Sequence, residues 1–482
     1  MGLRLIYGRA GTGKSEKCYK EISEKIKQNN KILIITPEQF SFTAEKKLME
    51  AIETEAVFNA EVVTFSRMAY RVIQEIGGRT ETNLSKCGKA MLIYSILNNC
   101  KKDLKFLGKT DENVDMAGTA ITEFKKHGIS VEQLKQETEK QSDIYLKNKL
   151  NDINMIYEKF QEQIAGKYID ETDLLTILAQ NVDKVPDFKE NLIYIDEFAG
   201  FTSQEYDIIQ KLVKIAKQVT ITICTDTIYE IKNADTDIFY SNQITINKLL
   251  QLASENDIKI EEVELEQTYR FKTPELKHLE QNLYNSKINY CEQIPQNIKI
   301  FLAKNQYSEI EEVAKKIYKL VRDENYRYRD IAVITKNIDT YSSLARAIFD
   351  KYNIPIFIDE NRDLSQNILV QYVLSILEIF TKNWTEEAVL NYIKIGFSEI
   401  DEDDLFRLEK YCLKWGIKQN KWKKEFTYGN YEEKDKEEIA RLEEIRKQII
   451  EPLISLKNKL DENKTAEGIS RTIYNFLIEQ KK

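Results

Sequence analysis

The chain contains 482 residues, of which 42% are hydrophobic and 31% charged, with a formal net charge of −8. This length favours about three domains, and the composition is typical of a globular protein that folds in water. The sequence has neither a signal peptide nor the roughly 20 apolar residues that cross a bilayer, and its six scattered cysteines form no CxxC pair. We therefore expect a cytoplasmic protein with reduced thiols, no membrane partner and no basic coat for nucleic acid over its whole surface.

The N-terminal segment has the pattern of a β–α–β unit. Residues 3–7 form an expected strand, residues 8–13 the loop after it, and the helix that starts at Lys14 carries apolar residues at i+4 spacing. A second strand is expected at 31–37, where Pro37 stops it, and a third at 61–66. The pattern predicts a parallel sheet with right-handed crossovers.

From about residue 67 to 190 the pattern is helical, with no convincing strand, and strands return at 192–195 and 219–224. A new unit starts near Pro295, with expected strands at 298–302, 331–335 and 355–358 and expected helices at 309–322 and 341–349. The rest is helical and highly charged, and its Lys and Glu runs near 423–447 are typical of solvated helix faces.

These segments predict an α/β fold of two domains that are each interrupted by helices. Residues 1–75 and 190–290 form the expected first domain, and 76–189 its helical insertion. Residues 295–365 form an incomplete second domain, and 366–482 a truncated helical insertion. Because the chain stops inside helical material, we expect a fragment of a longer protein.

A phosphate-binding loop is the strongest chemical signal. Residues 8–15 match the pattern G-x-x-x-x-G-K-[ST] between a strand and a helix. In such a loop the glycines allow the backbone to approach the phosphates of ATP closely, and the backbone N–H groups at the start of the following helix face these phosphates. The lysine contacts the β- and γ-phosphates, and the serine binds Mg²⁺. The expected nucleotide-binding residues are Gly8, Arg9, Ala10, Gly11, Thr12, Gly13, Lys14 and Ser15.

Two further segments carry expected catalytic residues. Asp196 and Glu197 follow the strand at 192–195, which suits Asp196 to hold Mg²⁺ together with Ser15 and Glu197 to orient or deprotonate the attacking water. Arg270 lies just before the second α/β unit, where an arginine can reach a γ-phosphate and stabilise the developing charge. Taken alone, each feature is also common as a surface turn or a salt-bridge partner.

Three strings of sequence together resemble a known family. They are residues 8–15 (GRAGTGKS), residues 36–42 (TPEQFSF) and residues 64–72 (TFSRMAYRV). With the split α/β domains, they are similar to UvrD-type superfamily 1 helicases, and more specifically to the B subunits of bacterial AddAB helicase–nucleases. The resemblance runs from residue 1 to about 380. It implies two RecA-like domains with parallel sheets and large all-helical insertions.

The resemblance also implies a function. Such complexes resect double-stranded DNA ends for recombinational repair, and the B subunit pairs with AddA, helps to recognise the Chi sequence, and carries a 5′–3′ exonuclease domain held by a 4Fe–4S cluster. If the resemblance holds, the nuclease and the cluster lie beyond residue 482. Residues that match the single-stranded DNA contacts of related helicases are Thr36, Pro37, Thr64, Phe65 and Ser66. Arg270 matches the arginine that contacts the γ-phosphate.

The sequence departs from an active motor in several places. No adenine-binding glutamine precedes the loop, Asp-Glu-Phe-Ala-Gly at 196–200 replaces Asp-Glu-x-Gln-Asp, and residues 225–229 lack the glutamine that links nucleotide state to DNA. ATP binding with slow or no hydrolysis therefore fits better than an active superfamily 1 motor. A P-loop kinase or another ATPase that does not act on nucleic acid is a third alternative, disfavoured by the long insertion and the second α/β unit.

Overall fold

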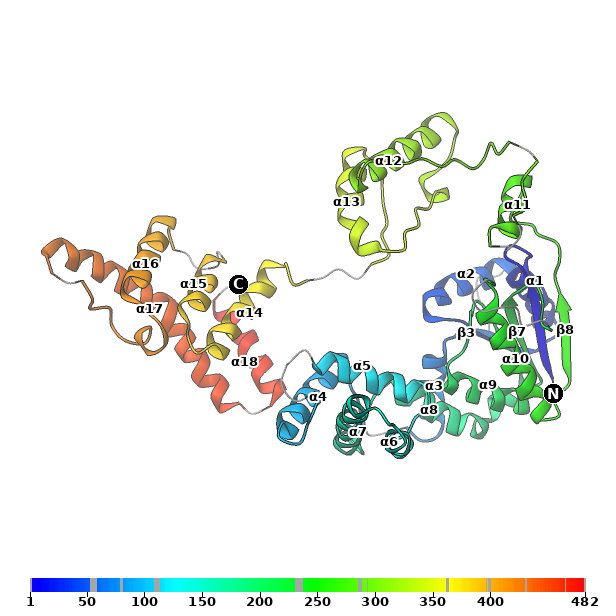
Figure 1. The fold of residues 1–482 in the computed structure, drawn as a ribbon, viewed down its shortest axis with the longest axis horizontal. Coiled ribbons are helices and arrows are strands. Elements are labelled where there is room, and N and C mark those ends of the chain that lie inside the picture. The colour runs from blue at the N-terminus through cyan, green and yellow to red at the C-terminus, as the bar shows by residue number, and fades with distance from the viewer. Residues whose placement is uncertain are drawn as a thin grey trace. The chain divides into compact units, whose positions relative to one another are not determined.

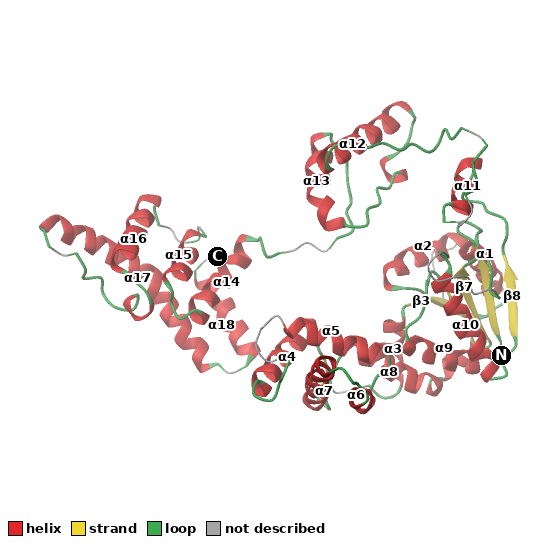
Figure 2. Cartoon of the chain, viewed as in Figure 1, coloured by secondary structure: helices red, strands yellow, loops and turns green. Residues whose placement is uncertain are grey.

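The computed structural model describes residues 2–52, 59–78, 81–107, 113–229, 237–284, 288–292, 294–360, 364–395, 397, 400–429, 431–463 and 465–480. The chain divides into two compact units, Met1–Ile300 and Phe301–Lys482 (Figure 1). Within the described residues every strand belongs to the first unit, and the second unit contains helices and loops (Figure 2). No described helix has the length and apolarity needed to cross a membrane.

The first unit is built on a six-stranded sheet in the order β3-β2-β6-β7-β1-β8, in which all neighbours are parallel. The predicted α/β class with a parallel sheet is therefore confirmed. The strands are β1 Leu3–Gly8, β2 Lys31–Ile35, β3 Ala60–Val63, β6 Asn191–Ile195, β7 Gln218–Cys224 and β8 Ile260–Glu264.

The two edge strands of the sheet differ from the prediction. The third strand ends at Val63 rather than 66, because the Thr64 hydroxyl accepts a hydrogen bond from the Arg67 N–H at 3.2 Å and starts helix α3 (Phe65–Glu75). The edge strand β8 was not predicted. Its sequence Ile-Glu-Glu-Val-Glu is mostly solvent-exposed and carries too few apolar residues to stand out.

Apolar side chains on both faces of the sheet explain why helices cover both faces. One core contains Ile6, Ile32 and Ile34 of the strands with the inner sides of α1 (Lys14–Lys27) and α2 (Ser41–Ile52). The core on the opposite face joins alternate strand residues to four helices. These helices are α3, α8 (Glu171–Asn181), α9 (Ser203–Ile215) and α10 (Tyr240–Glu255).

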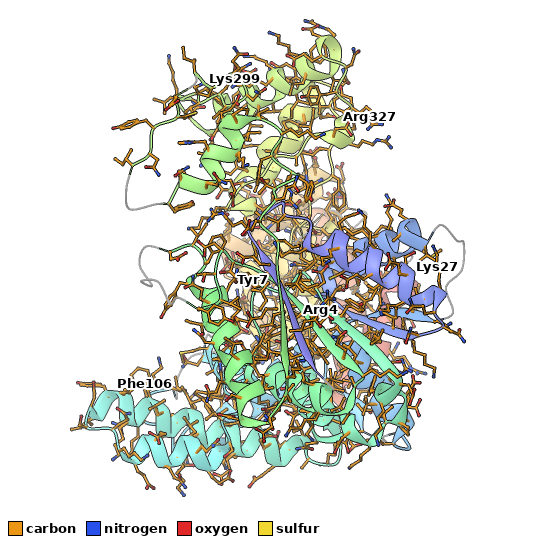
Figure 3. All side chains as sticks on the ribbon, turned by 90° about the vertical axis from the view of Figure 1, so that its right-hand side faces the viewer. Arg4, Tyr7, Lys27, Phe106, Lys299 and Arg327 are labelled. Carbon is orange, nitrogen blue, oxygen red and sulfur yellow. The ribbon has the colours of Figure 1, made fainter. Side chains whose placement is uncertain are left out.

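Strand β1 lies between β7 and β8 and is fixed to its surroundings by polar contacts from Arg4 and Tyr7, which are labelled in Figure 3. The Arg4 Nε donates to Glu261 of β8 at 3.0 Å, and Arg4 Nη2 donates to Glu21 of α1 at 3.1 Å. The Tyr7 hydroxyl donates to Glu264 at 3.3 Å. These contacts tie the strand that leads into the glycine loop to its neighbouring helix and edge strand.

The helical insertion has its own core. The helices α4 (Lys86–Cys100), α5 (Asn113–Lys126), α6 (Val131–Glu139) and α7 (Ile144–Ile164) pack around Ile93, Ile156 and Phe160. The prediction of no strand between 67 and 190 was wrong in one detail, since β4 (Thr82–Asn83) and β5 (Tyr168–Ile169) form a short parallel pair where the chain enters and leaves the insertion. These strands are only two residues long, which is too short for a periodic pattern.

A buried ionic network joins the insertion to α8. The Lys89 Nζ donates to Asp170 Oδ2 at 2.8 Å, and the Lys125 Nζ donates to the same oxygen at 3.3 Å and to Asp173 Oδ2 at 2.8 Å. Lys125 and Asp170 are both buried. Burial alone would raise the pKa of Asp170, but the hydrogen bonds and charges of the two lysines outweigh it and hold that pKa below its ordinary value.

The second unit begins with a helical pair in the predicted places. The helices α12 (Gln306–Asp323) and α13 (Ile338–Lys351) pack through a small apolar core. The strands predicted at 298–302, 331–335 and 355–358 are not formed, since these residues run without a strand assignment. Their apolar side chains are exposed, as in Leu302 (101%) and Ile334 (93%), because no described neighbouring strand supplies a hydrogen-bonding ladder.

The rest of the second unit is helical, as predicted. A core that contains the fully buried Trp422 holds together five helices. They are α14 (Ile368–Thr381), α15 (Glu386–Lys394), α16 (Glu402–Trp415), α17 (Glu433–Glu462) and α18 (Ala466–Glu479). The short helix α11 (Pro274–Asn282) belongs to the first unit and follows the segment that contains Arg270.

Candidate nucleotide-binding site

The predicted phosphate loop connects β1 to α1 in a conformation that needs its glycines. Gly11 and Gly13 have φ values of 76° and 82°, in the left-handed region that favours glycine. A Cβ at Gly8 would lie 2.4 Å from the carbonyl oxygen of Leu265, and one at Gly11 would lie 2.6 Å from the Cβ of Arg270. The loop is therefore held closely by the segment after β8, and α1 starts directly behind it with free N–H groups facing the loop.

The Lys14 ammonium lies across the inside of this loop. Its Nζ donates to the carbonyl oxygens of Gly8 at 2.8 Å and Arg9 at 2.9 Å. Burial lowers the pKa of Lys14, and the nearby Arg270 lowers it further. A cation held in this position beside helix N–H groups is suited to contact phosphate oxygens, which would exchange with the two carbonyls.

Asp196, at the carboxyl end of β6, is the buried acid of the site. Thr222 of β7 donates a short hydrogen bond to Asp196 Oδ1, whereas Oδ2 is buried and accepts no hydrogen bond within the part of the chain that the structure describes. Burial raises the pKa of Asp196 above its ordinary value, and the Thr222 hydroxyl and the nearby Ser15 hydroxyl offset only part of the rise. A buried carboxylate oxygen without a donor fits a divalent cation, so the residues present suit Mg²⁺.

Glu197 lies beside the first turn of α1. It accepts hydrogen bonds from the Ser15 hydroxyl at 3.4 Å and from the Lys47 ammonium of α2 at 3.2 Å, both at Oε1. Its φ of 67° places a non-glycine residue in the left-handed region, a strain of about 1–3 kcal/mol that the surrounding structure must maintain. Sequence reasoning missed Lys47 and Thr222, because neither is adjacent to a motif and only the sheet order brings them to the site.

Arg270 lies next to the loop. The backbone N–H groups of Tyr269 and Arg270 donate to the carbonyl of Gly11 at 2.8 and 3.3 Å. The Tyr269 ring lies 3.5 Å from where a Cβ on Gly13 would be. The Arg270 guanidinium forms no ion pair with any described residue, which leaves its charge available to a ligand of the loop.

The Arg9 side chain has a structural role within the same loop. Its Nε donates to Glu280 of α11 at 3.1 Å, and its Nη1 lies 3.6 Å from Asp226 Oδ2. The guanidinium also stacks over the Phe239 ring at 5.0 Å. Any contribution of Arg9 to nucleotide binding would therefore come from its backbone, while its side chain joins the loop to α11 and to the loop after β7.

The residues expected to contact DNA lie at the same carboxyl edge of the sheet, after β2 and β3. Thr36 and Thr64 are buried, and Phe65 is buried with its ring 5.6 Å from that of Phe198 in an edge-on contact. Pro37 and Ser66 are half-buried. The neighbouring Phe42, at the start of α2, is 76% exposed and is the aromatic ring most accessible to a ligand here.

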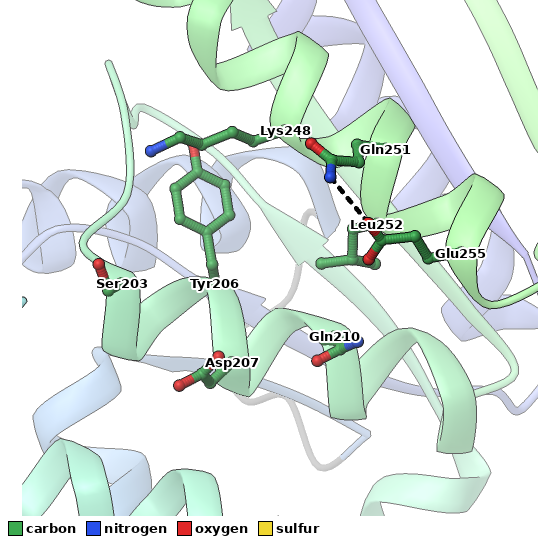
Figure 4. A pocket seen from close by; sticks show the side chains of 8 residues that line it. All are labelled: Ser203, Tyr206, Asp207, Gln210, Lys248, Gln251, Leu252 and Glu255. Atoms are coloured by element: carbon green, nitrogen blue, oxygen red, sulfur yellow. Dashed lines mark hydrogen bonds between the residues drawn. The ribbon is translucent and has the colours of Figure 1, made fainter. Parts of the chain in front are cut away.

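A separate open pocket lies between α9 and α10 (Figure 4). Its polar wall includes Lys248, whose Nζ lies 5.1 Å from the centre of the Tyr206 ring, and a hydrogen bond of 2.7 Å from Gln251 to Glu255. None of the predicted site residues lines this pocket. It is therefore separate from the nucleotide site.

Nearly the whole chain is similar to known bacterial proteins. The chain is 38% identical over 487 residues to a protein of Clostridium novyi (strain NT) and 40% identical over 501 residues to one of Clostridium tetani (strain Massachusetts / E88), covering 99% of this chain in both cases. A protein of Thermoanaerobacter sp. (strain X514) is 38% identical over 497 residues. All three are named as the B subunit of an ATP-dependent helicase/deoxyribonuclease, and this chain spans 42–44% of their lengths.

A family comparison covers the first unit. The profile of the family described as "ADDB, N-terminal" matches residues 5–280, more than half of the chain. That span includes the glycine loop, Asp196, Glu197 and Arg270, and it ends within α11. The chain therefore belongs to the AddB N-terminal family.

Proposed function

We propose that this chain binds ATP with Mg²⁺ and single-stranded DNA as the helicase-like region of an AddB subunit, and that it acts as a scaffold rather than as a motor. One observation carries the nucleotide site: the Lys14 ammonium, the Ser15 hydroxyl, Glu197 and the unpartnered Asp196 Oδ2 surround one glycine loop. In this arrangement Lys14 and the helix N–H groups bind phosphates, Ser15 and Asp196 hold Mg²⁺, and Arg270 faces the γ-phosphate. The bound Mg²⁺ supplies positive charge that neutralises the phosphates.

The scaffold role is supported by what surrounds Glu197. This residue is in position to act on a water molecule, but its carboxylate is already engaged by Lys47. Ala199 and Gly200 stand where related helicases carry a glutamine and an aspartate, so the polar side chains that would transmit nucleotide state to DNA are missing at these two positions. The preceding Phe198 packs against Phe65 and Phe201. Slow or unproductive hydrolysis follows from this arrangement.

DNA binding in the first unit is proposed for the carboxyl edge of the sheet. Pro37, Ser66 and the exposed ring of Phe42 provide an accessible edge, while Thr36, Thr64 and Phe65 shape it from below. The ring is suited to stacking on an unpaired base. For the whole protein, we propose that AddA is the partner subunit. The proposed activity is resection of double-stranded DNA ends for recombinational repair, with recognition of the Chi sequence. We place the 5′–3′ exonuclease and its 4Fe–4S cluster in a part of the protein beyond this sequence.

The Mg²⁺ assignment makes a test of the nucleotide site possible. ATP binding is expected to require Mg²⁺. The pKa of Asp196 is raised, so a proton competes with the cation for this carboxylate in mild acid. The affinity for Mg²⁺ should therefore fall as the pH drops through that pKa. In the Asp196→Asn variant, ATP binding should no longer depend on Mg²⁺, and its affinity should no longer fall in acid. Titration calorimetry of ATP with and without Mg²⁺ across pH 4–8 measures both effects.

A matched substitution keeps the test specific. Asp187→Asn changes the same chemical group near the other end of the sheet, where it contacts Lys31 at 2.7 Å, and should leave the Mg²⁺ dependence as in the unaltered chain. Equal ATP affinity with and without Mg²⁺ in the unaltered chain would overturn the assignment of Asp196 and Ser15.

A further inference from the structure

The second unit contains a segment with an unusual concentration of positive charge. Residues 410–424, at the end of α16 and in the loop after it, contain six lysines and no aspartate or glutamate, although the whole chain has a net charge of −8. Five of these lysines are exposed and one is half-buried. The six are Lys410, Lys414, Lys418, Lys421, Lys423 and Lys424.

These lysines differ from the other basic residues of the same helical cluster. On α16 and α17, Arg407 pairs with Glu438 at 3.7 Å, Arg441 with Asp404 at 2.7 Å, and the buried Arg446 with Glu443 at 2.5 Å. None of the six lysines forms an ion pair with a residue in the described part of this cluster. Their charges are therefore not neutralised by described carboxylates of this cluster and remain concentrated near the surface.

An aromatic pair lies among the lysines. The rings of Trp415 and Tyr428 are stacked, with their centres 5.7 Å apart and their planes at 17°. The Lys414 Nζ lies 5.1 Å from the Trp415 ring centre, and the Lys421 Nζ lies 5.1 Å from the Tyr428 ring centre. Tyr428 is 41% exposed. The accessible Tyr428 ring thus lies beside the Lys421 ammonium, and the Lys414 ammonium lies at the neighbouring Trp415 ring.

The pair is held rigidly. The Tyr428 N–H donates to the Tyr411 hydroxyl at 3.1 Å, and the Lys421 ammonium donates to the Trp415 carbonyl at 3.0 Å. Gly429 has a φ of 87°, and a Cβ there would lie 3.3 Å from the Trp415 ring. The loop after α16 is therefore folded back so that the Tyr428 ring remains next to the lysines of the helix, without an ordering cost when a ligand arrives.

We propose that these six lysines and Tyr428, which we call the lysine–tyrosine surface, bind single-stranded DNA. The lysines would contact the phosphate backbone and the Tyr428 ring would stack on a base, which is the combination that sequence-independent single-strand binding requires. This inference adds a second DNA surface, in the second unit, to the one proposed for the first. It rests on the proposed function only in taking DNA as the nucleic acid.

The test uses the full chain and a fluorescein-labelled oligothymidylate of about 16 nucleotides, the upper end of common site sizes. Fluorescence anisotropy gives the dissociation constant as a function of salt concentration. The double variant Lys410→Gln/Lys414→Gln should reduce the slope of log K against log salt by about 1.4, since each single-strand phosphate contact contributes about 0.7. Tyr428→Ala should weaken binding about tenfold, while Tyr428→Phe, which keeps the ring, should bind as the unaltered chain does.

Control variants separate this proposal from the others. Lys304→Gln/Lys319→Gln removes two lysines from the other helical part of the second unit, near α12, and should leave the slope unchanged. Phe42→Ala tests the DNA surface of the first unit. Loss of binding only in Phe42→Ala would overturn the lysine–tyrosine surface and leave the proposed function standing, whereas no binding in the unaltered chain would overturn the DNA-binding role itself. Equal binding of poly-glutamate, unaffected by Tyr428→Ala, would show an acidic-protein surface and overturn the proposal.

Discussion

Replacing Lys14 by alanine is expected to weaken ATP binding by roughly a hundredfold, because hydrogen bonds to charged groups contribute about 1.5–3 kcal/mol each and the ammonium can reach more than one phosphate oxygen. The structure makes this lysine central, since its Nζ is already fixed between the carbonyls of Gly8 and Arg9 at the inside of the loop. Equilibrium titration with a fluorescent ATP analogue gives the two dissociation constants directly.

The matched control for this experiment lies on the same helix. Lys20 is 72% exposed and lies 3.5 Å from Glu16, one turn away on the solvent side of α1. Surface pairs of this kind contribute about 0–1 kcal/mol, so Lys20→Ala should bind ATP as the unaltered chain does. An affinity that survives Lys14→Ala within a factor of about two, a change of only about 0.4 kcal/mol, would mean that the loop does not bind the nucleotide phosphates.

Replacing Asp170 by alanine is expected to weaken the packing of the helical insertion against α8 by about 1–3 kcal/mol. The change removes the carboxylate that Lys89 and Lys125 share, so that Lys89 keeps only its hydrogen bond to Thr122 and the buried Lys125 keeps only Asp173. Asp170 makes no capping hydrogen bond to α8, so helix capping does not contribute to the effect. Hydrogen exchange of amides in α5 and α8 measures the opening free energy of this region separately from the rest of the chain.

The effect of this substitution should depend on pH in a defined direction. Because the folded-state pKa of Asp170 is below its ordinary value, the stabilisation is present above the unfolded pKa of about 3.9 and is lost as pH falls through the lower folded value. The difference between Asp170→Ala and the unaltered chain should therefore shrink in acid. Lys126→Ala, which removes an exposed lysine 3.0 Å from Glu123, should change exchange by less than about 0.5 kcal/mol. Equal exchange in both variants at neutral pH would show that the network does not secure the insertion.

The elements that carry the candidate site could be predicted from local sequence. The glycine loop, the strand that leads into it and the acidic pair after β6 are each encoded within a few consecutive residues, so their pattern can be recognised without a fold. What it could not show was the set of contacts that depend on the sheet order. Thr222 reaches Asp196 only because β7 lies beside β6, and Lys47 reaches Glu197 only because α2 packs near that edge.

The wrong and missing strands have a related cause. Residues 331–335 have the apolar, β-branched composition of a strand, but composition does not supply a neighbouring backbone to pair with, and Val333 and Ile334 are exposed. Conversely, β8 pairs with β1 although its pattern is weak, because the parallel register of Leu3–Tyr7 offers it a complete set of partners. Strand formation is thus decided by the neighbour as much as by the segment.

ATP hydrolysis by the 482-residue chain, with and without single-stranded DNA, tests most directly whether the nucleotide site drives movement along DNA. Given the engaged Glu197 and the loss of polar side chains at Ala199 and Gly200, we expect slow hydrolysis that single-stranded DNA scarcely changes. Strong stimulation by single-stranded DNA, abolished by Lys14→Ala, would contradict the scaffold account and identify the chain as a working motor.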